Sequence, residues 1–197
     1  MGCDLDMMAG AVVLATSTLL RSLAVWSYEG YRAVSKHVKH DLQKLDLFLD
    51  FDVQLPLEPL KCSFQHITID FDPVWSDKIK DENLLYAILH ASRDTLLNLT
   101  IEDAMTSAAL DKILTCETFL HARALVLNDV PIGYDWPPLG VTFPSLVSLA
   151  IQTGNDEEDQ FLPDNYFSAL GKSSATHSSV PLPSGDSRSQ RRLCRIA

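Results

Sequence analysis

A short pattern of hydrophobic and polar positions recurs six times along the chain. Each copy has an apolar anchor, two other residues, a second anchor, one other residue and a third anchor, as in Leu96, Leu99 and Ile101. The middle anchors are Leu23, Leu45, Ile67, Leu99, Leu125 and Leu149, with steps of 22, 22, 32, 26 and 24 residues between them. Because strand side chains alternate between two faces, each copy predicts a short strand with one buried face. The near-regular step indicates a repeat architecture.

Several connectors between these copies predict helices. Residues 81–91 and 106–117 each place aliphatic side chains at helical spacing on one face, and Tyr31, Val34 and Val38 predict a shorter helix after the first strand. Irregular connectors are predicted over residues 53–63, which contain two prolines, and 131–144, which contain four prolines and two glycines. Strand, turn and helix or loop therefore alternate along the chain.

This alternation predicts an α/β fold, and the step matches that of leucine-rich repeats, roughly 20–29 residues. We expect a leucine-rich-repeat-like solenoid with a parallel sheet and with helices or loops on the convex side. Its irregular repeat domain of about six strands covers residues 1–170, and residues 171–197 form a Ser-rich basic tail predicted to be disordered. The alternative is an ordinary α/β domain with parallel strands and crossover helices, which sequence period does not separate from a solenoid.

The segments TLLNLTIEDAM and PSLVSLAIQTG resemble the irregular leucine-rich repeats of fungal F-box proteins. In that family an N-terminal F-box binds the adaptor of a cullin-type ubiquitin ligase, and the repeats hold the substrate. Two features depart from the family. No F-box is recognisable before Leu20, so binding to the ligase adaptor would require an F-box in a longer form, and the chain resembles a fragment. The family's Asn ladder is also missing, because its positions hold Tyr28, Asp50, Asp72, Ala104, Val130 and Gly154.

In a solenoid the residues between the anchors face the concave side in three columns. The columns are Ser22, Lys44, His66, Asn98, Ala124 and Ser148; Ala24, Asp46, Thr68, Thr100, Val126 and Ala150; and Trp26, Phe48, Asp70, Glu102, Asn128 and Gln152. The predicted partner-binding residues are Trp26, Asp46, Phe48, His66, Thr68, Asp70, Asn98, Thr100, Glu102, Asn128 and Gln152. Their mixture of aromatic and acidic side chains is typical of interfaces and predicts a partner segment of basic character. Trp26 and Phe48 could equally pack against the loops above the strands.

Charge narrows the class of partner. The net charge is −10, and residues 171–197 carry +4, which leaves −14 on the first 170 residues. Such an acidic body repels nucleic acid and anionic membranes, so the expected partner is a protein. The apolar run from Ala9 to Leu20 is too short to span a bilayer, and the start lacks the basic region of a signal peptide. A cytoplasmic or nuclear location is expected.

No residue pattern predicts catalysis, a metal or a cofactor. The four cysteines are scattered without a CxxC pair, and the six histidines show no metal-binding spacing. Gly171, Lys172 and Ser173 look like the end of a phosphate-binding loop, but Tyr166 occupies the place of its required first glycine. The expected role is a protein interaction module that recognises a substrate in the F-box/leucine-rich-repeat manner. The alternatives are a scaffold or binding protein unrelated to ubiquitin and, less favoured, a small α/β enzyme.

Overall fold

A computed structural model describes the backbone of most of the chain. The described residues are 20–25, 28–38, 42–49, 60, 62–71, 82–102, 107–130, 134–153, 175–179 and 192–196. Trp26 lies outside them, as does most of the connector 53–63.

Six parallel strands form an open sheet in which each strand pairs with the next one in the sequence. They are β1 (Ser22–Val25), β2 (Lys44–Leu49), β3 (His66–Phe71), β4 (Asn98–Glu102), β5 (Ala124–Val130) and β6 (Ser148–Thr153). The strand β8 (Arg192–Ile196) pairs antiparallel with β6, and β7 (Ala175–Ser179) pairs antiparallel with β8. These two strands fall within the segment predicted to be disordered, and the domain boundary at residue 170 stays a prediction. The predicted α/β class with a parallel sheet is confirmed.

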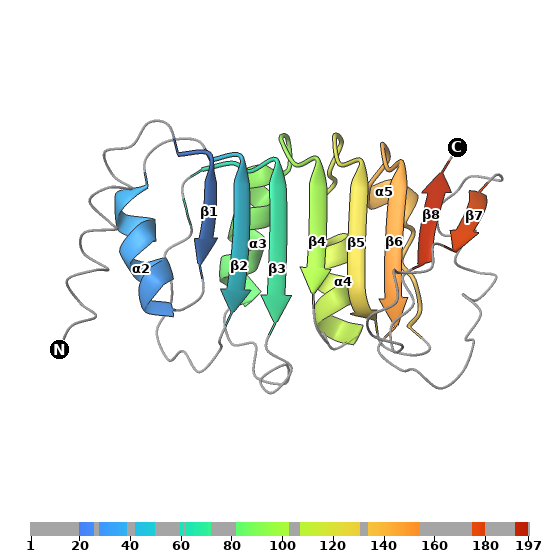
Figure 1. Cartoon of the computed structure of the whole chain (residues 1–197), viewed down its shortest axis with the longest axis horizontal. Helices are drawn as coiled ribbons and strands as arrows, with labels where there is room; N and C mark the ends of the chain where they lie inside the picture. The colour runs from blue at the N-terminus through green and yellow to red at the C-terminus, as the bar shows by residue number, and fades with distance from the viewer. Residues whose placement is uncertain are drawn as a thin grey trace.

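Among the described elements, helices lie behind the sheet in Figure 1, and another helix lies beside the first strand. They are α3 (Glu82–Ser92), α4 (Ser107–Thr115) and α5 (Leu139–Thr142) behind the sheet, and α2 (Tyr28–His37) beside β1. Two of them, α3 and α4, match the predicted helices to within two residues at each end. The connector over residues 131–144 is predicted to be irregular, and residues 134–138 form neither helix nor strand, but α5 forms one helical turn after them. Leu139 is fully buried in that turn, and the Phe143 N–H donates to the Leu139 carbonyl at 2.7 Å.

The core lies between the sheet and the helices. Burial alternates along the strands, as in β4, where Leu99 and Ile101 are buried and their neighbours are half-buried. The two strand anchors of every copy are at most 7% exposed, and the first anchor is buried in every copy except the first, where Leu20 is half-buried. Burying each such aliphatic side chain contributes roughly 1.5–3 kcal/mol, so the anchors provide much of the stabilisation.

The backbone joins successive strands in the same way at all five parallel junctions. The carbonyl just before one strand accepts two N–H groups from the residues that begin the next strand, at 2.7–3.2 Å. The accepting carbonyls are those of Arg21, Gln43, Gln65, Leu97 and Arg123. These bonds need no particular side chain, so units without an Asn ladder can still be held in register. Each bond contributes about 0.5–1.5 kcal/mol net.

Buried hydroxyl groups attach the connectors to the helices. The Ser92 Oγ accepts a hydrogen bond from the Phe64 N–H at 3.1 Å and donates to the Ile88 carbonyl at 2.8 Å. The Tyr31 hydroxyl, on α2, accepts from the Leu60 N–H at 3.0 Å. Both side chains are almost inaccessible to solvent, so these bonds satisfy backbone groups that water does not reach. None of the described helices has the length and apolar character needed to cross a membrane.

Candidate functional site

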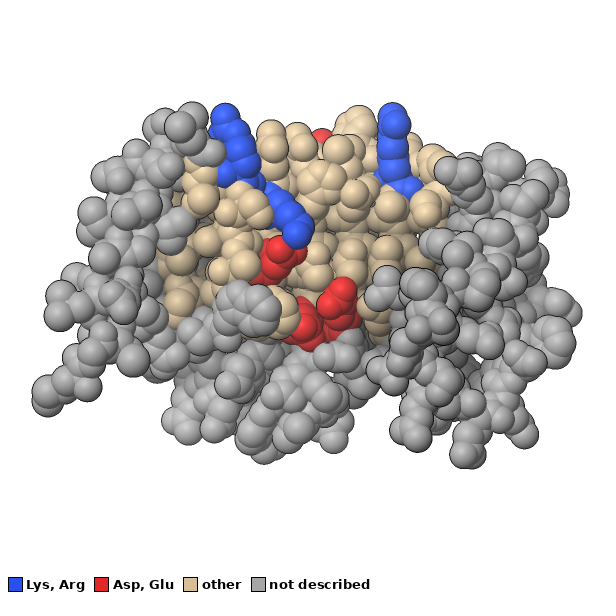
Figure 2. Space-filling view, in the orientation of Figure 1, with Lys and Arg blue, Asp and Glu red and all other residues tan. Residues whose placement is uncertain are grey.

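The open strand face is formed by the side chains of β1 to β6 that point away from the helices. Strand pairing aligns the first predicted column from Ser22 to Ser148 and the second from Ala24 to Ala150, strand by strand. Over β2 to β5 these side chains are mostly half-buried and mostly polar. No described helix covers this face, which Figure 2 shows in the orientation of Figure 1. A surface of this kind can receive another molecule along several strands at once.

The first column contains one hydrogen-bonded pair. The Asn98 Nδ2 and the His66 Nδ1 lie 2.9 Å apart across neighbouring strands. The amide therefore donates to the ring nitrogen when His66 is neutral with its proton on Nε2. This bond fixes the orientation of the His66 ring on the open strand face.

An ion pair links the first column to the second. The Lys44 Nζ lies 2.7 Å from the Asp46 Oδ2, and the lysine side chain is 48% exposed. The other carboxylate oxygen of Asp46, Oδ1, is buried and has no hydrogen-bond partner among the described residues. A buried carboxylate oxygen costs free energy when no donor replaces the water that it has lost. Thr68 and Thr100 continue the second column with short side chains that leave room above the sheet.

The third column is continuous only from β2 to β4. Phe48 pairs with Asp70, and Asp70 pairs with Glu102, so an aromatic ring and two carboxylates lie in one row. Figure 2 shows acidic side chains close together on this face, towards the carboxyl ends of the strands, and basic ones towards the opposite ends. The row contains no basic residue.

The predicted continuation of this column to Asn128 and Gln152 is not found. The pairing of β5 with β6 shifts between Leu127 and Val130, because β5 has one more residue there than β6. An extra residue of this kind interrupts the alternation of faces. Asn128 is half-buried, and the Gln152 side chain lies outside what the structure describes.

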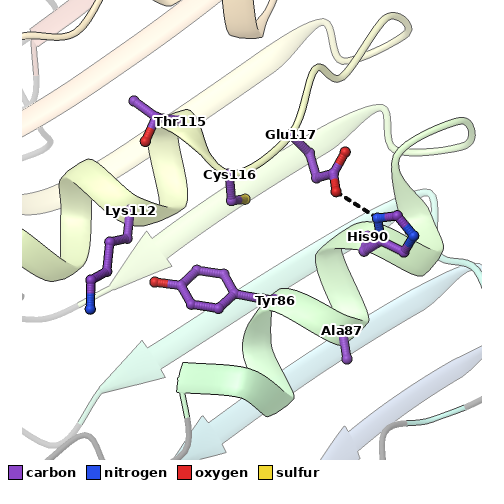
Figure 3. A pocket seen from close by; sticks show the side chains of 7 residues that line it. All are labelled: Tyr86, Ala87, His90, Lys112, Thr115, Cys116 and Glu117. Atoms are coloured by element: carbon purple, nitrogen blue, oxygen red, sulfur yellow. Dashed lines mark hydrogen bonds and ion pairs between the residues drawn. The ribbon is translucent and has the colours of Figure 1, made fainter.

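A second candidate site is a shallow groove of about 530 Å³ on the helix side of the molecule. Figure 3 shows it between α3 and α4, with Tyr86 and His90 on one side and Lys112 and Cys116 on the other. The His90 Nδ1 lies 2.5 Å from the Glu117 Oε1. The sequence held no signal for this groove, because its residues come from two segments that only the packing of α3 beside α4 brings together.

A cysteine, a histidine and a glutamate in one groove raise the question of nucleophilic catalysis. Burial, aided by the adjacent charge of Glu117, raises the pKa of the Cys116 thiol to about 11. The thiol donates to the Ile113 carbonyl at 3.2 Å. An activated nucleophile requires a lowered pKa, so at neutral pH this thiol is protonated and unreactive. The arrangement fits a packed helix interface better than a catalytic centre.

Tyr134, near α4, has contacts that stabilise the fold. The Tyr134 hydroxyl donates to the Asp111 carboxylate, and burial together with this bond raises the pKa of Tyr134. Its ring meets Trp136 edge to face at 5.1 Å. These contacts fasten the connector before α5 to α4.

In the part of the chain that the structure describes, no three His, Cys, Asp or Glu side chains lie close enough together to hold a metal ion. Comparison with models of known protein families and with curated protein sequences finds no match.

Proposed function

We propose that the chain is a leucine-rich-repeat-like solenoid that binds a partner protein on its open strand face. The observation that supports this proposal is the alignment of six parallel strands, with helices behind the sheet and a row of polar, half-buried side chains in front. Side chains that are neither fully solvated nor packed against a described element form a ready interface. An enzymatic function is the less favoured alternative, because the raised pKa of the Cys116 thiol keeps it protonated at neutral pH. The proposed location is the cytoplasm or the nucleus.

Substrate recognition of the F-box type is the specific form of this role that the sequence resemblance favours. This role requires an F-box that docks to the ligase adaptor, since the repeats alone would hold a substrate without docking to the ligase. The second candidate is a scaffold unrelated to ubiquitin. Co-purification of the natural full-length product with the cullin adaptor would separate these two roles.

Site-specific photocrosslinking tests the face itself. A benzoylphenylalanine at Thr100, in the middle of the open strand face, should trap a partner in an extract of the source cells. The matched control places the same residue at Ala91, which is exposed on α3 on the opposite side. Equal crosslinking from both positions, or crosslinking from Ala91 alone, would contradict the proposal.

A further inference from the structure

The row formed by Phe48, Asp70 and Glu102 has an unusual combination of charges. Asp70 and Glu102 occupy paired positions on β3 and β4, so their backbones are about 4.8 Å apart. Like charges on directly paired positions of neighbouring strands repel each other. Within the described residues neither carboxylate forms an ion pair, although both are half-buried. A cation that arrived here would relieve this repulsion.

Asp46 provides a second, independent observation on the same face. Its Oδ2 is paired with Lys44, whereas its Oδ1 is covered and has no hydrogen-bond partner within the described residues. Asp46 stands two residues before Phe48 on β2, so it belongs to the neighbouring column. A bound cation does not reach the covered Oδ1, but the Asp46 side chain is 22% exposed, so a cation beside it can share the charge of this carboxylate with Lys44.

The spacing of these groups fits an extended peptide. Positions i and i+2 of a strand lie about 6.6 Å apart and point to the same side. This spacing separates the Asp46 column from the Phe48 column, and it equally separates alternate side chains of a peptide lying parallel to the strands. Two cationic side chains with one residue between them can therefore reach Asp46 and the pair of Asp70 and Glu102 together.

The geometry points to an arginine-containing extended segment of the partner protein, with the motif Arg-x-Arg, as the ligand of this face. This inference rests on the proposed function and names the chemistry of its partner. Arginine fits better than lysine, because its planar guanidinium can bond a carboxylate through two N–H groups and stack on an aromatic ring such as that of Phe48. Phe48 is one strand away from Asp70, within reach of a guanidinium bound there.

A direct test uses a fluorescein-labelled peptide, Thr-Arg-Thr-Arg-Thr, and fluorescence anisotropy at low salt. The double variant Asp70→Asn with Glu102→Gln should raise the Kd at least tenfold. The charge-matched control, Asp94→Asn with Asp135→Asn, removes two exposed carboxylates from outside this face and should leave the Kd within about twofold. Equal losses in both double variants would show only attraction to an acidic protein and would overturn the inference.

Three further peptides and one further variant test the geometry. Replacement of both arginines by citrulline should abolish binding, and replacement by lysine should weaken it about threefold or more. A peptide of the same composition with adjacent arginines, Thr-Thr-Arg-Arg-Thr, should also bind at least threefold more weakly, because its arginines point to opposite sides. Phe48→Leu should reduce the preference for arginine over lysine. Equal binding of all these peptides would overturn the inference.

Folding of the variants can be checked independently of binding. Removal of the repulsion between Asp70 and Glu102 should leave the Tm unchanged or raise it, so lost binding cannot be assigned to unfolding. If the Thr100 crosslinker traps a partner but the arginine peptide does not bind, this inference fails and the proposed function stands. If the Thr100 crosslinker traps nothing from cells that contain the partner of the natural protein, the proposed function fails first.

Discussion

The hydroxyl of Ser92 provides a sharp test of how the connectors are held to the helices. Ser92 is fully buried at the end of α3, and its Oγ accepts a hydrogen bond from the Phe64 N–H. The change Ser92→Ala removes that acceptor and adds no atom. The Phe64 side chain is also fully buried, so water does not readily replace the lost bond.

The expected loss follows from two opposing effects. A buried N–H left without its partner costs about 1–3 kcal/mol. Alanine favours a helix over serine by at most about 0.5 kcal/mol, which offsets part of this cost. The free energy of unfolding should therefore fall by about 0.5–2.5 kcal/mol.

Ser35→Ala is the matched control. Ser35 also lies near the end of a helix, and its Oγ donates to the Arg32 carbonyl at the surface. The control makes the same change in helix propensity but leaves no buried group without a partner, so its unfolding free energy should change by less than about 0.5 kcal/mol. The difference between the two variants then isolates the buried bond.

Urea denaturation followed by circular dichroism at 222 nm measures both variants. The m-value should not change, because the same surface is exposed on unfolding. If Ser92→Ala costs no more than Ser35→Ala, the hydroxyl does not support the backbone of the connector, and the reasoning from its hydrogen bonds is refuted.

Four other predictions concern the faces of the sheet, the groove and the backbone junctions. Leu99→Asp should unfold the protein, because it places a charge in the core. Thr100→Asp, at the neighbouring position on the other face, should lower the Tm only slightly. Similar losses of stability in the two variants would contradict the assigned faces. Iodoacetamide should label Cys116 slowly at pH 8 and faster as the pH approaches about 11, as read by peptide mass spectrometry, with fast labelling at pH 7 as the contrary result. The thiol ionises near pH 9 in the unfolded chain and near pH 11 in the folded one. Its contribution to stability is therefore complete below pH 9 and is lost as the pH rises to 11 and above. The variant Cys116→Ser should show a smaller fall in stability over this pH range. Hydrogen exchange should show slow amides at the start of each strand from β2 to β6, and fast exchange there would refute the backbone junctions.

The strands could be predicted well because their signal is local. Alternating burial depends only on the two-residue period of a strand, so the anchors around Leu45, Ile67 and Leu99 identified the buried face without any knowledge of their neighbours. The same reasoning predicted the first two columns on the other face, and pairing confirms both. The partner-binding role of these residues stays a prediction.

Local signals were weaker where packing decides the conformation. The turn α5 forms among prolines and glycines because Leu139 is drawn into the core. The extra residue of β5 between Leu127 and Val130 displaces Asn128 from its predicted column, and nothing in the hydrophobic pattern indicated this shift. The groove beside Cys116 depends on which helices pack together, which no single segment encodes.

The sequence by itself determined which residues of each strand enter the core and which remain outside, since this follows from a period of two within each segment. Only the tertiary structure decided that α3, α4 and α5 all lie on one side of the sheet, so that the other side stays uncovered by any described helix. It also showed that backbone bonds close every parallel junction without an Asn ladder, and that one oxygen of Asp46 has no hydrogen-bond partner in the part of the chain that the structure describes. These features depend on contacts between units 22 to 32 residues apart, and such contacts form only when the connectors bring the units side by side.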